Sequence, residues 1–74
     1  MSKKNNNRIP RKFNSIKGKM LIETNMSRPG DILHIYKNDC GTGYLAYNTR
    51  TNKYAYMFLS VLRNAEIFEV IEIG

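Results

Sequence analysis

The residues best suited to catalysis near neutral pH are one histidine, His34, and one cysteine, Cys40. A cysteine–histidine pair acts as a nucleophile when a third group orients the histidine and an oxyanion hole lies nearby, and the sequence marks neither. Asp31 and Asp39 would complete a metal-binding set, but these four residues have no recognisable ligand spacing. We therefore expect a protein that is not an enzyme and that uses no metal or other cofactor.

Basic residues are concentrated at the start of the chain. Residues 1–19 contain seven of the twelve and no acid, so the remainder holds five bases against six acids. The seven are Lys3, Lys4, Arg8, Arg11, Lys12, Lys17 and Lys19. A segment with few apolar residues and one sign of charge buries too little surface to order itself, so we expect a flexible basic tail over 1–19. The alternative is that Phe13 and Ile16, three residues apart, dock on the folded part or on a partner.

From residue 20 onward the pattern predicts a small β domain over 20–74. The expected strands span residues 19–24, 31–37, 44–48, 53–58 and 66–73. A turn is expected at 28–30, where Pro29 fixes φ and Gly30 is free to adopt a positive φ. Residues 59–65 could extend a strand or form one helical turn. Five short strands without crossover helices predict an antiparallel meander closing into a small SH3-like or OB-like barrel, with a flat sheet and one helix as the alternative.

Aromatic residues gather on the predicted hairpin. If Asn48 pairs with Lys53, then Tyr47 lies opposite Tyr54, and both side chains point to the same face of the sheet. Leu45, Tyr56 and Phe58 share that face, whereas Tyr44 points to the other one. Because a barrel this small has one interior, some aromatic surface should stay exposed or be covered by a partner, which favours a homodimer.

The last predicted strand carries a glutamate at every third position. In a regular strand the side chain of Glu69 projects to the face opposite Glu66 and Glu72, so the three acids do not form one stripe. Such charges commonly protect the edge of a sheet from aggregation. The alternative is a recognition edge for a basic partner.

Two binding functions compete for these residues. The candidate protein-binding residues are Tyr44, Tyr47, Tyr54, Tyr56 and Phe58 together with Glu66, Glu69 and Glu72. The same aromatic residues could instead stack on the bases of single-stranded nucleic acid. The seven basic residues of the tail, Arg50 and Lys53 could contact the phosphates of single-stranded or duplex nucleic acid. However, a basic tail on a nearly neutral body gives salt-sensitive binding with little sequence readout.

In length, in its asparagine-, lysine- and tyrosine-rich composition and in its lack of enzymatic residues, the chain resembles small host-takeover proteins of phages of low-GC Gram-positive bacteria. It is similar in particular to phage inhibitors of the replication sliding clamp. The resemblance implies a non-enzymatic protein that binds the host clamp and blocks its loading onto DNA. The chain contains no glutamine, so it lacks the peptide by which clamp partners usually bind. It would have to bind elsewhere, for example with its acidic body in the basic channel and its tail dispensable or pointing outward.

A third interpretation rests on the segment RPGDIL at 28–33. This segment resembles the opening strand of small barrel toxins that cut messenger RNA. The resemblance would give Arg28 a role in assisting cleavage.

The sequence also bears on location. Basic residues near the N-terminus are not followed by an apolar segment, so we expect no secretory signal. The longest nearly apolar run, at 54–62, is too short to span a bilayer. We expect a protein of the cytoplasm, which is the host cytoplasm if a phage encodes it.

Overall fold

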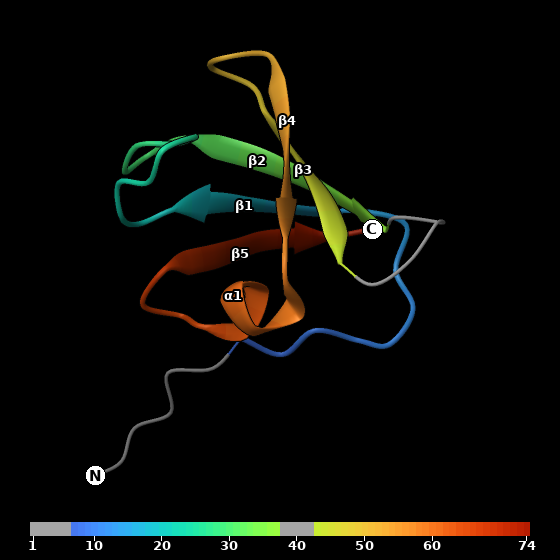
Figure 1. The fold of residues 1–74 in the computed structure, drawn as a ribbon. Helices are drawn as coiled ribbons and strands as arrows, with labels where there is room; N and C mark the ends of the chain where they lie inside the picture. The colour runs from blue at the N-terminus through green and yellow to red at the C-terminus, as the bar shows by residue number, and fades with distance from the viewer. Residues whose placement is uncertain (1–6, 38–42) are drawn as a thin grey trace, which may run out of the picture.

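The computed structural model describes residues 7–37 and 43–74. The elements along the chain are β1 (Ile16–Met20), β2 (Ile32–Lys37), β3 (Tyr44–Asn48), β4 (Lys53–Met57), α1 (Leu59–Arg63) and β5 (Phe68–Ile73). The strands form one antiparallel sheet in the order β4-β3-β2-β1-β5, which confirms the predicted five-stranded, mostly β class (Figure 1). Within the described residues the edge strands β4 and β5 do not pair with each other, so the sheet is open.

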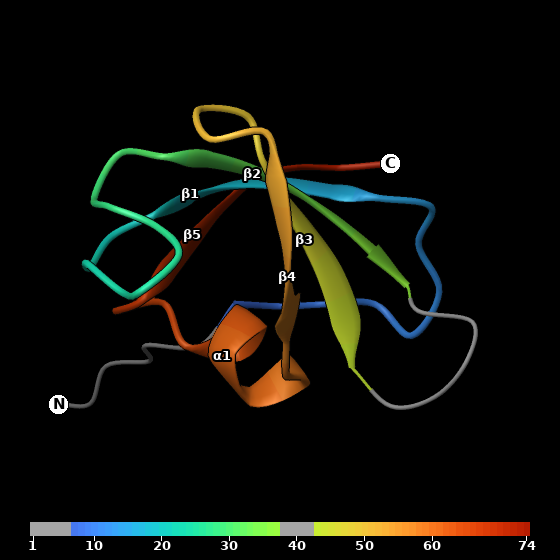
Figure 2. The same ribbon diagram turned by 45° about the horizontal axis from the view of Figure 1, so that its top comes forward.

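The sheet is curled. Figure 2 shows β3 and β4 turned away from the direction of β1 and β5, with α1 beside one end of β4. The first four strands form a meander, and the chain then makes the short helix α1 before β5 returns to pair with β1. Of the two expectations for residues 59–65, the helical turn is therefore the one observed.

The predicted hairpin and turn are both present. Asn48 pairs with Lys53 and Tyr47 with Tyr54, in the expected register. The connection ends at Asn52, whose φ of 59° lies in the left-handed region that asparagine tolerates better than most residues. At the Pro-Gly turn, Gly30 has a φ of 95°, and the Asp31 N–H donates to the Arg28 carbonyl at 3.1 Å.

The first strand differs from its prediction. It spans Ile16–Met20 instead of 19–24, and it lies inside the sheet between β2 and β5. The prediction of a tail over 1–19 is therefore wrong for residues 16–19, because the buried positions 16, 18 and 20 alternate there with two outward-facing lysines. Residues 1–6 lie outside the described part of the chain.

The segment before β1 belongs to the fold. Ile9 and Phe13 pack against the core, and the side-chain amide of Asn7 donates to the carbonyl oxygens of Leu62 and Phe68 at 2.8 and 2.7 Å. Docking of Phe13 and Ile16, the alternative to a flexible tail, is what the structure contains. The core consists of Ile16, Met20, Leu33, Ile35, Ala46, Leu62 and Phe68.

Gly18 of β1 is packed too closely for any side chain. A Cβ atom at this position would lie 2.1 Å from Cζ of Phe68 and 2.7 Å from the backbone oxygen of Glu69. The fully buried ring of Phe68 thus occupies the space that any other residue at position 18 would need.

We expect Gly18→Ala to lower the free energy of unfolding by about 1–3 kcal/mol, because overpacking displaces the ring or the strand. Urea unfolding of the full chain measures this. The matched control is Gly74→Ala, whose Cβ would make an ordinary contact 3.5 Å from Ser15 Oγ and should change stability by less than about 0.5 kcal/mol. The double variant Gly18→Ala, Phe68→Leu should lose less free energy of unfolding than the two single variants lose together, because the shorter side chain leaves room for the added methyl group. Equal unfolding midpoints for Gly18→Ala and the unmodified chain would contradict this packing.

Candidate functional site

One face of the sheet carries a row of rings, here called the aromatic face. Tyr36 on β2, Tyr54 and Tyr56 on β4, and Phe58 directly after β4 are exposed, and Tyr47 on β3 is half-buried among them. The exposed fractions are 58% for Tyr54, 71% for Tyr56 and 68% for Phe58. Tyr47 and Tyr54 are cross-strand partners whose ring centroids lie 4.9 Å apart with the planes tilted by 52°. The hydroxyl group of Tyr47 is also hydrogen-bonded to the side-chain amide of Asn52.

The structure places two tyrosines differently from the predicted set of protein-binding residues. Tyr44 lies on the opposite side of the sheet, where its ring stacks on Phe13 with centroids 5.6 Å apart, so the structure separates it from the other candidates. Tyr36 is not among the predicted residues, but it lies on the aromatic face because β2 places it opposite Leu45, which in turn pairs with Tyr56. The alternating pattern of residues 31–37 contains the signal for Tyr36.

The glutamates of β5 are arranged differently from the prediction. The register between β1 and β5 shifts, so that Lys19 pairs with Glu69 and Lys17 pairs with Glu72. Ile71 is the extra residue of this bulge, and it brings Glu69 and Glu72 to the same face. The prediction that they point to opposite faces is therefore wrong. Glu66 lies before β5, in the connection from α1.

Acidic residues neighbour the basic residues of the sheet. Lys19 Nζ lies 3.8 Å from Glu69 Oε1, and Lys17 faces Glu72 across the two strands. Of the other predicted phosphate-binding residues, Arg50 is held by Asp31 and Lys53 borders a cavity on the concave side. Arg8, Arg11 and Lys12 are exposed on the segment before β1, and Lys3 and Lys4 lie outside the described residues. The predicted phosphate-binding residues that the structure describes thus lie in three separate places: on β1, on the hairpin, and on the segment before β1.

A buried carboxylate joins the turn before β2 to the hairpin. Asp31 is 5% exposed, and its Oδ1 accepts from Arg50 Nε at 2.7 Å while its Oδ2 accepts from Arg50 at 3.0 Å. Oδ2 also accepts from the side-chain amide of Asn48 at 2.8 Å and from the Arg28 N–H at 2.9 Å. The hydrogen bonds from Arg50, then Asn48 and the Arg28 N–H, hold the pKa of Asp31 well below its usual range, although burial acts in the opposite direction.

Of the residues considered for catalysis and metal binding, the structure describes Asp31 and His34, whereas Asp39 and Cys40 lie outside its described residues. His34 is half-buried on the same face as Tyr47, with Lys17 on its other side. In residues 7–37 and 43–74 no group of three or more histidine, cysteine or acidic side chains is placed to hold a metal ion. The backbone of Arg28 is engaged in the turn with Asp31, and its side chain is exposed.

Comparison with family models, with curated proteins and with solved structures finds no match for this chain. Within the part of the chain that the structure describes, no helix is long and apolar enough to cross a membrane.

The Asp31 contact predicts a specific dependence of stability on pH. Because its pKa is lower in the folded than in the unfolded chain, the unfolded chain binds the extra proton as the pH falls. The contribution of Asp31 is therefore complete above about pH 5 and decreases as the pH falls past the ordinary value of 3.8.

Urea unfolding between pH 7 and pH 3 tests this prediction with the Asp31→Asn variant. We expect the variant to be less stable at pH 7 and to approach the unmodified chain toward pH 3. The control is Glu23→Gln, which removes an exposed carboxyl group and should leave the acid-induced loss unchanged. The prediction is contradicted if the free energy of unfolding changes with pH in the same way for the unmodified chain and for Asp31→Asn.

Proposed function

We propose that this chain is a non-enzymatic inhibitor that binds a host replication protein, the DNA polymerase sliding clamp, and blocks its loading onto DNA in the host cytoplasm. The observation that carries the protein-binding part is the exposure of three adjacent rings, those of Tyr54, Tyr56 and Phe58, on one side of β4. The choice of the clamp rests on the resemblance in length and composition to phage inhibitors of this ring.

The properties of the aromatic face support binding to a protein. Aromatic side chains lose little conformational entropy on binding and are enriched among the residues that dominate interface energies. Here they project from neighbouring strands of one sheet, which fixes their spacing better than a loop would. Large exposed apolar patches in folded proteins commonly mark interaction sites.

The charge distribution favours protein over nucleic acid as the partner. Lys17 and Lys19 face Glu72 and Glu69, and Arg50 is bound by Asp31, so these cations are partly neutralised within the chain. Binding along a phosphate backbone draws most of its affinity from free cations. Direct nucleic-acid binding stays the second candidate, since the rings of Tyr54 and Tyr56 could stack on bases while Arg8 and Arg11 contact phosphates.

We propose in addition a barrel-like shape for the sheet, a homodimer, and a role in binding for two acidic residues of β5. Because β5 returns to pair with β1, the two edge strands are β4 and β5, and we propose that the curled sheet is an SH3-like or OB-like barrel that is open between them. A homodimer in which part of the aromatic face is covered by a second copy is consistent with a chain of this size, because small cores gain stability from oligomerisation. Glu69 and Glu72 share one face and could contact the basic channel of a clamp, although Lys19 and Lys17 beside them partly offset their charge.

The test measures binding of the full chain to a purified bacterial sliding clamp. The variant carries Tyr56→Ser and Phe58→Ser, and since both side chains are more than half exposed it should fold normally. We expect its Kd to be at least about tenfold higher than that of the unmodified chain, because such rings act as anchors. The matched control is Ile71→Ser, which removes a 49% exposed apolar side chain from the other edge strand and should bind normally.

A second variant separates the nucleic-acid candidate. Arg8→Gln, Arg11→Gln and Lys12→Gln remove three exposed charges and keep β1, which shortening the chain to 20–74 would destroy. If DNA were the ligand, the slope of log affinity against log salt would fall by roughly 3 in this variant. Absence of clamp binding by the unmodified chain, together with that change of slope, would contradict the proposed function.

A further inference from the structure

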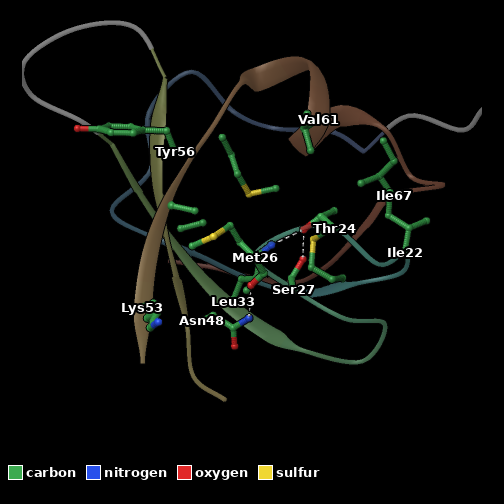
Figure 3. A pocket seen from close by; sticks show the side chains of 14 residues that line it. Ile22, Thr24, Met26, Ser27, Leu33, Asn48, Lys53, Tyr56, Val61 and Ile67 are labelled. Carbon is green, nitrogen blue, oxygen red and sulfur yellow. Dashed lines mark hydrogen bonds between the residues drawn. The ribbon is translucent and has the colours of Figure 1, made fainter. Parts of the chain in front are cut away.

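The concave side of the sheet contains a cavity of about 310 Å³. It lies between the segment that follows β1, the inner side of β4, and Val61 of α1, as Figure 3 shows. Its lining is mostly apolar and includes three methionines, Met20, Met26 and Met57. Tyr56 reaches the rim, but its ring points away from the cavity (Figure 3).

Two small residues explain why the cavity exists. Ala46 and Ala55 are cross-strand partners on the inner side of β3 and β4, where the neighbouring inward positions of β2 carry Leu33 and Ile35. Two methyl groups in place of larger side chains leave space above this part of the sheet. Because β4 is an edge strand, no further strand of the described residues borders that space beyond β4.

The polar groups of the lining are few, and most are already engaged. The Asn48 amide donates to Asp31, and the hydroxyl groups of Thr24 and Ser27 are hydrogen-bonded to each other at 2.8 Å. Lys53 is the charged residue of the lining, and it makes no ion pair in the described part of the chain. A ligand would therefore meet an apolar interior with a single cation at its rim.

We infer that this cavity binds an anionic amphiphile, with its hydrocarbon part among the three methionines and its carboxylate at Lys53. The volume lies at the lower end of the range for small-molecule sites, about 300–1,000 Å³. Methionine side chains adapt to apolar ligands of different shape. A peptide would bring backbone N–H and C=O groups that this lining leaves without partners, whereas a hydrocarbon chain needs none. The site lies on the concave side and does not depend on the proposed function of the aromatic face.

The experiment uses the full chain with ¹³C-labelled methionine methyl groups and two probes, decanoate below its micelle concentration and the neutral decanol. We expect decanoate to shift the signals of Met20, Met26 and Met57 in a saturable way. Lys53→Gln should weaken decanoate binding by about three- to fivefold, the effect of an exposed ion pair, and should leave decanol binding unchanged. The matched control is Lys37→Gln, an exposed lysine that does not line the cavity.

A second variant, Ala55→Leu, fills the cavity without adding a polar group. It should retain the dispersed spectrum of a folded chain and lose binding of both probes. The inference is overturned if decanoate causes no saturable shift of the three methyl signals. It is equally overturned if Lys53→Gln binds decanoate as well as the unmodified chain does, or if a folded Ala55→Leu variant still binds decanoate. None of these outcomes depends on binding to a sliding clamp.

Discussion

The buried carboxylate of Asp31 is the constraint on which the rest of the arrangement depends. A buried charge is tolerated only when it is paired and hydrogen-bonded, and the partners of Asp31 come from two separate places, the turn at Arg28 and the hairpin residues Asn48 and Arg50. The contact therefore ties the start of β2 to the connection between β3 and β4. It fixes the position of β4, which supplies both the outward rings and the inner wall of the cavity.

A chain of this size has a small hydrophobic core, so residues from outside the sheet are needed to complete it. Phe68 fills the space above Gly18, while Ile9 and Phe13 cover the core from a segment that contributes no strand. The large residues left outside this core, Tyr54, Tyr56 and Phe58 above all, follow from the same limit, because the sheet has apolar side chains on both of its sides. Surplus apolar surface and a small core are thus two consequences of one sequence pattern.

Local patterns predict much of the fold and of the candidate site. The hairpin register follows from the four residues between Asn48 and Lys53, so the face shared by Tyr47, Tyr54 and Tyr56 is predictable from the amino-acid sequence alone. The first strand is harder to predict, because Lys17 and Lys19 alternate with its inward-facing residues and make the segment look like part of a basic tail. The bulge at Ile71 and the pairing of Arg50 with Asp31 could not be predicted, since each arises from contacts between segments distant in the sequence.

Binding through the aromatic face is tested most directly by a cross-saturation NMR measurement on the labelled full chain mixed with an unlabelled, purified bacterial sliding clamp. If the aromatic face binds the clamp, saturation of the clamp attenuates the signals of Tyr54, Tyr56 and Phe58, whereas the signals of Arg8 and Arg11 keep their intensity. No attenuation anywhere, or attenuation confined to the segment before β1, would contradict the claim that the aromatic face binds the partner.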